Sequence, residues 1–204
     1  GADNDTIYGD AGDDYLDGEA GADSLFGGGG ADVMFGGDNN DYMEGDHYDV
    51  AGDDYLDGEA GNDTIIGAGG ADVIFGGADD DSLYGDATNV AVADHGDDYI
   101  DGESGHNLIS GFGGNDTLYA LDGNDTVYGG DGNDYVDAGD GANMILGGAD
   151  NDDIWAGKDN DWIQGDAGND ELVGGKVILF RKKPKYQNIW RRFAKEENLR
   201  RAAV

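Results

Sequence analysis

A nine-residue repeat runs through most of this chain of 204 residues. Read from Gly9, the sequence divides into GDAGDDYLD, GEAGADSLF, GGGGADVMF and GGDNNDYME, and the same frame still holds in GDAGNDELV, which ends at Val173. Eighteen such units can be counted, the first of them truncated. A short fixed period is typical of solenoids, in which each repeat contacts mainly its neighbours. The repeat therefore constrains the fold more strongly than any other feature of the sequence.

Two places of the unit carry nearly constant chemistry. The sixth place is aspartate in 16 of the 18 units and asparagine in the other two, at Asn107 and Asn143. The aspartates are Asp5, Asp14, Asp23, Asp32, Asp41, Asp54, Asp63, Asp72, Asp81, Asp98, Asp116, Asp125, Asp134, Asp152, Asp161 and Asp170. The eighth place is apolar in all 18 units: Ile7, Leu16, Leu25, Met34, Met43, Leu56, Ile65, Ile74, Leu83, Ile100, Ile109, Leu118, Val127, Val136, Ile145, Ile154, Ile163 and Leu172.

The order of residue types within the unit predicts a turn followed by a short strand. Glycine fills two or three of the first four places in many units, where it lets the backbone adopt positive φ and turn tightly. Places seven to nine then form a strand whose middle side chain faces away from its two neighbours. Stacked coils of two strands each would bury the eighth-place residues as a thin core between two sheets. So little apolar surface does not fold a chain unless another source of free energy contributes.

We expect that source to be a bound cation. Aspartates stacked about 4.8 Å apart along a parallel sheet repel one another, and a hard, oxygen-seeking cation reverses that effect. Calcium accepts about six to eight oxygen ligands in loose geometry, both carboxylates and the backbone carbonyls that a glycine-rich turn exposes. Magnesium prefers a tighter octahedron and retains its water molecules, so it should substitute poorly.

The unit resembles the GGxGxDxUx nonapeptide of the RTX (repeats-in-toxin) family, and the resemblance covers about six sevenths of the chain. It implies an all-β fold, a right-handed parallel β-roll of about nine two-strand coils over residues 1–175. In such a roll, the sixth-place aspartates and the turn carbonyls of successive coils would share multiple Ca²⁺ ions along both edges. The resemblance also implies a bacterial protein exported by type I secretion.

Composition argues against several other functions. Residues 1–175 hold 44 acidic residues and one lysine, a net charge of −43, so we expect no binding to nucleic acid or to anionic membrane surfaces. The chain has no cysteine and no apolar run near the roughly 18 residues of a membrane span. The strings DGNDTVYGGDGND and GFGGND match EF-hand and dinucleotide-binding motifs only weakly. A solid roll offers no cleft for a catalytic pair, so we expect no enzyme activity from this chain.

Two insertions lengthen the repeat. HYDV at 47–50 and a longer one within ATNVAVADH at 87–95 each follow a Gly-Asp pair, and both fall in even-numbered units. If successive units face opposite sides of the roll, both insertions project from the same edge, two coils apart. Each contains or ends on a histidine, His47 or His95, with Asp49 or Asp94 nearby. A joint transition-metal site is one interpretation, and solvated surface loops are the other.

The even-numbered units also carry an aromatic residue at outward-facing places seven or nine. These residues are Tyr15, Phe35, Tyr55, Phe75, Tyr99, Tyr119, Tyr135 and Trp155. A row of this kind can stabilise a sheet through contacts between neighbouring coils. It can also bind a glycan, a neighbouring protein or a second roll. The sequence leaves both interpretations open.

Residues 176–204 leave the repeat and reverse its charge, with ten basic and two acidic residues. We expect a last strand over Lys176–Phe180 and a helix that begins near Pro184. The helix would gather its large apolar side chains on one face: Tyr186, Ile189, Trp190 and Phe193. This tail would cap the open end of the roll. The alternatives are a secretion signal, as the family resemblance implies, an appended non-native extension, and a basic helix that binds a membrane or nucleic acid.

The sequence thus favours a calcium-binding β-roll of a secreted or cell-surface bacterial protein, which folds when it meets about millimolar Ca²⁺ outside the cell. An adhesion or glycan-binding module that uses the aromatic row is a second hypothesis. The noncatalytic arm of a secreted enzyme, such as an RTX protease, lipase or alginate epimerase, is a third. The chain begins at Gly1 within the repeat, so we expect further sequence before it, with any export signal.

Overall fold

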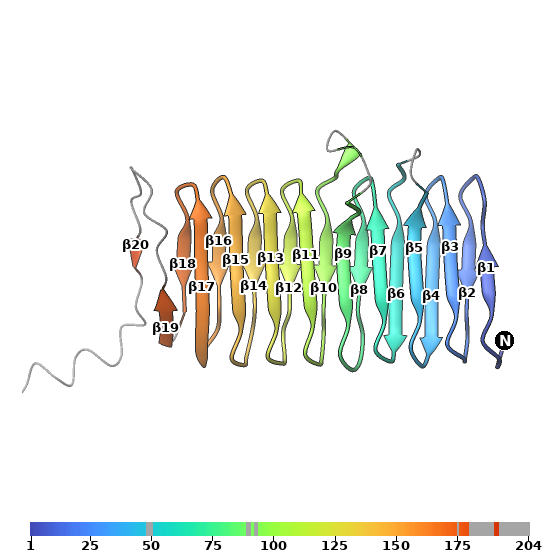
Figure 1. Cartoon of the computed structure of the whole chain (residues 1–204), viewed down its shortest axis with the longest axis horizontal. Helices are drawn as coiled ribbons and strands as arrows, with labels where there is room; N and C mark the ends of the chain where they lie inside the picture. Colours follow the sequence, from blue (N-terminus) through green and yellow to red (C-terminus); the bar gives the residue numbers. More distant parts are fainter. Residues whose placement is uncertain (48–50, 89–90, 92–93, 175, 180–189, 192–204) are drawn as a thin grey trace, which may run out of the picture.

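The computed structural model is a parallel β-solenoid in which the chain winds in flat coils from one end to the other (Figure 1). It describes residues 1–47, 51–88, 91, 94–174, 176–179 and 190–191. Within these residues, 20 strands form two 10-stranded sheets. Successive strands belong alternately to the two sheets, and every strand pair is parallel among those described.

The first sheet contains the odd-numbered strands: β1 (Thr6–Tyr8), β3 (Ser24–Gly28), β5 (Tyr42–Asp46), β7 (Thr64–Ala68), β9 (Ser82–Asp86), β11 (Leu108–Gly113), β13 (Thr126–Asp131), β15 (Met144–Ala149), β17 (Asn160–Ala167) and β19 (Lys176–Leu179). The second contains the even-numbered strands: β2 (Tyr15–Asp17), β4 (Val33–Asp38), β6 (Tyr55–Ala60), β8 (Val73–Phe75), β10 (Tyr99–Asp101), β12 (Thr117–Tyr119), β14 (Tyr135–Asp137), β16 (Asp153–Trp155), β18 (Glu171–Val173) and β20 (Trp190–Arg191).

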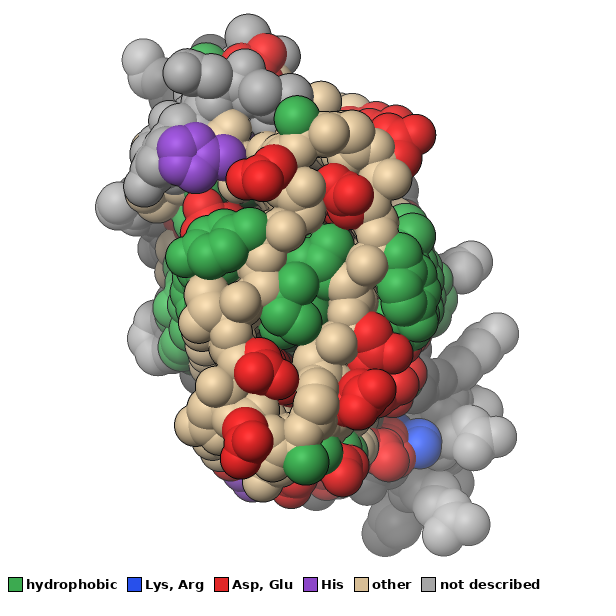
Figure 2. Space-filling view, turned by 90° about the vertical axis from the view of Figure 1, so that its right-hand side faces the viewer, with side chains coloured by type: hydrophobic (Ala, Val, Ile, Leu, Met, Phe, Trp, Pro, Cys, Tyr) green, Lys and Arg blue, Asp and Glu red, His purple; other side chains and the backbone are tan. Residues whose placement is uncertain are grey.

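The eighth-place residues form the core between the two sheets, as the repeat predicts. Sixteen of them are buried, from Leu16 to Ile163, and the two at the ends, Ile7 and Leu172, pack against the others. In strands such as β7 and β10 the residues on either side of the core residue are less buried than it is, because they face outward. Viewed from the β1 end, apolar side chains fill the centre of the roll, and carboxylates lie towards its upper and lower edges (Figure 2).

The strand register explains how the fold absorbs the insertions. Met34 pairs with Leu56 and Ile74 pairs with Ile100, eighth place to eighth place, although the insertions lengthen those coils. The insertions lie between β5 and β6 and between β9 and β10, so both leave the roll at the same edge, as expected (Figure 1). Their residues 48–50, 89–90 and 92–93, which include Asp49, lie outside the described residues.

The turns bring successive coils into contact at glycine. Gly132 has φ 138°, in the left-handed region, and a Cβ there would overlap the carbonyl oxygen of Gly114 in the preceding coil. Glycine is required at such positions because both the backbone conformation and the close approach exclude a side chain. The stacking of turns therefore follows directly from the glycine places of the repeat.

The tail confirms one expectation and corrects another. The expected last strand is present as β19, which pairs with β17. The helix expected around Trp190 is wrong at its two described residues, because Trp190–Arg191 form β20 and pair with β18. The open edge of the last coil offers unpaired backbone groups, and strand addition satisfies them where a helix could not. Phe180, Pro184, Tyr186, Ile189 and Phe193 lie outside the described residues.

The aromatic row on the even-numbered strands is a chain of ring contacts between coils. Seven rings, Tyr15, Phe35, Tyr55, Phe75, Tyr99, Tyr119 and Tyr135, contact each other in succession. Their centroids are 5.6 to 5.9 Å apart and the rings are tilted, a favourable arrangement for aromatic pairs. Trp155 instead donates a hydrogen bond from Nε1 to Asp153 Oδ1 at 3.0 Å. The contacts support the sheet-stabilising interpretation of this row.

Replacing Tyr55, Phe75 and Tyr99 together with serine should lower the free energy of unfolding by about 2 kcal/mol or more. The substitutions break four ring contacts, and each aromatic pair contributes about 0.5–1.5 kcal/mol beyond its buried area. Denaturant unfolding with saturating Ca²⁺ measures the change. Tyr128→Ser is the control, since Tyr128 is an exposed tyrosine of the opposite sheet. Equal stabilities of the triple variant and the wild type would contradict the stabilising role of the row.

Candidate metal centre

The sixth-place side chains form two columns, one along each edge of the roll. We call the turns that lead into even-numbered strands the even edge, and the turns that lead into odd-numbered strands the odd edge. The even column is Asp14, Asp32, Asp54, Asp72, Asp98, Asp116, Asp134, Asp152 and Asp170. The odd column is Asp5, Asp23, Asp41, Asp63, Asp81, Asn107, Asp125, Asn143 and Asp161. The structure therefore brings all 16 predicted aspartates into two continuous lines.

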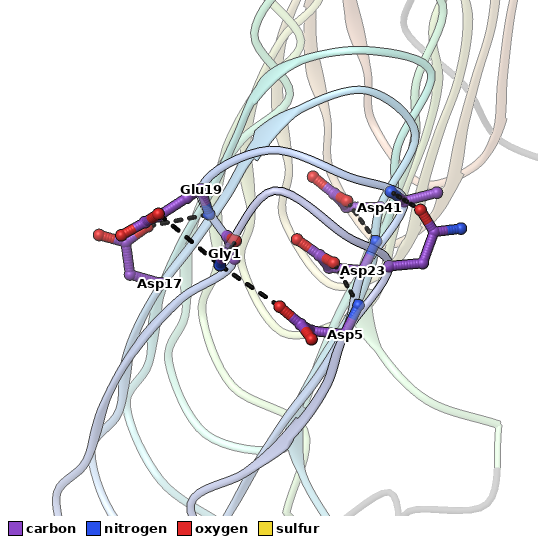
Figure 3. Close-up of polar contacts among 9 residues, drawn as sticks. Gly1, Asp5, Asp17, Glu19, Asp23 and Asp41 are labelled. Atoms are coloured by element: carbon purple, nitrogen blue, oxygen red, sulfur yellow. Dashed lines mark hydrogen bonds and ion pairs between the residues drawn. The ribbon is translucent and has the colours of Figure 1, made fainter.

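One hydrogen bond is repeated along each column. The backbone N–H of each member donates to Oδ1 of the member one coil later, over 2.6 to 3.4 Å. Figure 3 shows this arrangement at the first coils, where Asp5, Asp23 and Asp41 are stacked and two such bonds are drawn. The bond fixes the side-chain orientation, so that one carboxylate oxygen is used within the protein.

The second carboxylate oxygen is buried and has no hydrogen-bond partner in most of the column members. This holds for Oδ2 of Asp14, Asp23, Asp32, Asp41, Asp54, Asp63, Asp72, Asp81, Asp98, Asp116, Asp125, Asp134, Asp152 and Asp161. A buried, unpaired carboxylate oxygen is costly, because the protein replaces water with nothing of opposite charge. The repetition of this cost along both edges makes these oxygens candidate ligands for a cation.

Backbone carbonyl oxygens lie beside these carboxylates. A Cβ on Gly67 would overlap both Asp72 Oδ2 and the carbonyl oxygen of Gly85, so the two oxygens flank the same glycine Cα. Gly27, with Asp32 and Gly45, repeats the arrangement. Among the described residues, no group of three or more His, Cys, Asp or Glu side chains is arranged to hold a metal ion. A cation at these edges therefore needs carbonyl as well as carboxylate oxygens, and calcium accepts such an all-oxygen set.

The raised pKa values of several column carboxyls reflect the same cost of burying negative charge. The pKa of Asp72 is raised to about 9, mainly by burial; the N–H bond from Asp54 lowers it, and the Asp98 and Asp54 carboxylates add to the rise. Burial also raises the pKa of Asp98 to about 9, with a contribution from Asp116. For Asp152, burial is again the main cause, and its pKa is raised to about 8. These groups favour a proton or a cation over an isolated negative charge.

We expect the metal-free chain to gain β structure as the pH is lowered from about 9 towards 5. In the roll the pKa of Asp41 is raised to about 6 and that of Asp72 to about 9, mainly by burial, whereas an aspartate in an unfolded chain has a pKa near 4. A raised folded-state pKa stabilises the fold fully below the unfolded pKa, and that stability is lost as the pH rises through the folded values. Far-UV circular dichroism in excess chelator measures the change. Unfolding upon mild acidification would contradict this electrostatic account.

Two further aspartates, which do not occupy the sixth place of a unit, are also buried at the even edge. Asp46 and Asp86 are buried, and Oδ1 of each has no hydrogen-bond partner. Burial is the main cause that raises the pKa of Asp46 to about 6 and that of Asp86 to about 7. The Asp46 carboxylate in turn raises the pKa of Asp54, which identifies the two as neighbours. The sequence prediction missed both residues, although each ends the Gly-Asp pair before an insertion.

The histidines of the two insertions do not form the joint metal site considered above, as far as the described residues show. His95 Nδ1 lies 3.4 Å from Asp86 Oδ2. Asp86 directly precedes the insertion that ends at His95, so this contact lies within one insertion. The backbone N–H of His47 donates to the carbonyl of Gly28, in the neighbouring coil. Neither of these contacts joins His47 to His95.

The geometry defines a repeat protein with oxygen-rich edges that could hold cations, and the comparison with known families agrees. The model of the RTX calcium-binding nonapeptide repeat matches residues 1–25, 17–46, 48–83, 57–90, 85–109, 110–145 and 146–176. This chain belongs to that family. It is a calcium-binding β-roll, a structural type of domain. No curated protein matches the sequence, and no helix among the described residues has the length and apolarity to cross a membrane.

Proposed function

We propose that this chain is a secreted bacterial module that folds when its sixth-place aspartates bind Ca²⁺ outside the cell. The observation that supports the proposal is the double column of buried carboxylates with unpaired Oδ2 atoms. The family membership supports calcium as the ion. Export through type I secretion and a toxin-like or adhesin parent are parts of the proposal that rest on the resemblance alone.

Fourteen of the 16 sixth-place aspartates are the best candidates for calcium ligands. These are the nine of the even column, from Asp14 to Asp170, and five of the odd column, from Asp5 to Asp81. Each orients its carboxylate through the hydrogen bond described above or stands at the start of a column, and turn carbonyls supply further oxygens. Asp125 and Asp161 differ because asparagines precede them in their column. Bound Ca²⁺ supplies the positive charge that cancels the repulsion between coils.

Coupling between binding and folding follows from the one-coil spacing. Each carboxylate is oriented by the backbone of another coil, so the oxygens converge only when both coils are in place. The binding free energy is then also folding free energy, and the transition should be steep. Extracellular calcium modules bind at about 10⁻⁴–10⁻³ M, a range in which a chain would stay unfolded where Ca²⁺ is scarce.

A calcium titration followed by far-UV circular dichroism tests the proposed function. We expect a steep coil-to-β transition with Ca²⁺ and little β structure with the same concentrations of Mg²⁺ at pH 8. Calcium tolerates the irregular, carbonyl-containing ligand set, whereas Mg²⁺ demands a tighter octahedron. Full β structure at pH 8 in excess chelator would rule out folding by calcium.

Asp98→Asn should raise the calcium concentration at the folding midpoint, by about tenfold. The amide keeps the Oδ1 acceptor for the Asp72 N–H but removes a negative charge worth about 1.5–3 kcal/mol in a charged hydrogen-bonded contact. Asp97→Asn is a matched control, since Asp97 is exposed, accepts the Asn115 N–H and amide, and raises the pKa of Asp98 less than Asp116 does. One coil later, Asn115 Oδ1 accepts the Asn133 N–H in the same way, so an asparagine can replace Asp97 in this contact. Equal midpoints for both variants would show that the sixth-place charge is not used.

A second function, recognition of a glycan or protein by the aromatic row, has one observation in its favour. The rings at the two ends of the row are the most accessible, Tyr15 at 68% and Trp155 at 42% exposure. The Tyr55, Phe75 and Tyr99 serine variant separates the roles. Unchanged stability with lost glycan binding or self-association would support recognition, whereas lost stability alone supports the structural role.

A further inference from the structure

The two edges of the roll differ at the first place of the unit as well as at the sixth. On the even edge the first place is always glycine: Gly9, Gly27, Gly45, Gly67, Gly85, Gly111, Gly129, Gly147 and Gly165. On the odd edge, Gly18, Gly36, Gly58, Gly76 and Gly102 are followed by Ala120, Ala138 and Ala156. The change begins where Asn107 and Asn143 interrupt the aspartate column. The C-terminal half of the odd edge therefore departs from the repeat at both places that surround the carboxylate.

Both asparagines are satisfied entirely by the protein. Asn107 Oδ1 accepts the N–H of Asp81 at 2.9 Å, as an aspartate would, and its Nδ2 donates to the carbonyl of Gly102 at 2.9 Å. Asn143 repeats the pattern with Asp125 and with the carbonyl of Ala138, again at 2.9 Å for each bond. Where other coils have a buried carboxylate oxygen, these two coils have a donor that is already used.

The asparagine amide also donates a hydrogen bond to the first-place backbone carbonyl. In the aspartate turns the corresponding carbonyl lies close to a carboxylate oxygen. At Gly67 the first-place carbonyl of Gly85 and Asp72 Oδ2 flank the same Cα, as two acceptors. In the coil of Asn107 the first-place carbonyl is that of Gly102, and it accepts the amide of its own unit. Two ligand atoms are therefore removed at each asparagine, the carboxylate oxygen and the carbonyl oxygen.

The three alanines fill the same space with a methyl group. A Cβ on the first-place glycine of an aspartate unit would overlap Oδ2, as at Gly36 with Asp41 and at Gly58 with Asp63. Ala120, Ala138 and Ala156 carry that Cβ, and all three are buried in the hydrophobic core. Ala120 belongs to the unit of Asp125, and Ala156 to the unit of Asp161, whose Oδ2 atoms stay buried and unpaired. In these turns a methyl group therefore takes up space beside the carboxylate that glycine leaves open in the other turns.

Asp125 and Asp161 are consequently isolated carboxylates. Asp125 lies between the two asparagines, receives the Asn107 N–H and donates its own N–H to Asn143. Asp161 receives the Asn143 N–H. In the even column both of two neighbouring coils offer a sixth-place carboxylate, whereas here one of the two offers only a neutral amide.

We propose that the odd edge ceases to bind calcium at Asn107, and that its remaining turns, through Asp161, are held by amide hydrogen bonds and alanine packing. The even edge and the odd edge before Asn107 bind the ions. This inference rests on the proposed calcium function and narrows it to particular turns. The roll is then a one-edged calcium binder in its C-terminal half.

Two double variants on the same edge test the inference. We expect Asp125→Asn with Asp161→Asn to retain the wild-type number of bound Ca²⁺ ions and to change the folding midpoint by less than about twofold. We expect Asp41→Asn with Asp63→Asn, the matched pair in the N-terminal half, to lose ions and to raise the midpoint several-fold. Native mass spectrometry counts the ions, and circular dichroism gives the midpoints. Ion loss in the Asp125 and Asp161 pair would overturn the inference.

The reverse exchange provides an independent measurement. A variant with Asn107→Asp, Asn143→Asp, Ala120→Gly, Ala138→Gly and Ala156→Gly has an odd edge like the even one, and we expect it to bind more ions than the wild type. It should also be less stable in chelator, since it adds two buried charges and loses the amide bonds. An unchanged ion count in a folded variant would count against the inference. A wild-type chain that binds no Ca²⁺ would instead overturn the proposed function itself.

Discussion

Repulsion between buried carboxylates one coil apart is the constraint on which the rest of the structure depends. Neighbouring strands lie about 4.8 Å apart, so two adjacent charges would repel by roughly 3 kcal/mol at an effective dielectric constant of 20. The columns repeat that term along the roll, and most of their carboxylates have a buried Oδ2 atom without a hydrogen-bond partner. The thin core of one apolar residue per strand has little free energy with which to offset it. A bound cation or a proton is therefore a structural component of the roll.

The remaining features of the fold serve the stacking of coils. Glycines in left-handed conformation let the turns approach, as at Gly132 over Gly114. The strands keep their register across both insertions, so the extra residues are placed outside the sheets. The aromatic row adds contacts between coils on an outer face where the core cannot contribute. Each device acts between neighbouring coils, which makes the stability of the roll cooperative along its length.

The two edges of the roll differ in their sixth-place and first-place residues. The even edge keeps an aspartate in every coil, and both insertions with their buried Asp46 and Asp86 leave the roll there. In its C-terminal half the odd edge alternates amides with carboxylates and changes from glycine to alanine. The asparagine turns satisfy their polar atoms within the protein, whereas the aspartate turns leave a buried oxygen unpaired. In the arrangement that we propose, the molecule combines metal-dependent and metal-independent turns in one roll.

The sequence by itself determined the coil, the core and the two columns, because they follow from a period of nine that places aspartate and an apolar residue at fixed positions in each unit. Tertiary structure decided what each carboxylate or amide contacts. The bonds of Asp72, Asn107 and Asn143 join residues 18 or 26 positions apart, and the burial of Asp46 and Asp86 depends on the turns stacked against them. At Trp190 the local periodicity predicts a helix, but the structure has a strand that pairs with β18. Local patterns specify a repeating backbone, whereas the satisfaction of a polar atom depends on partners that only the stacked coils bring together.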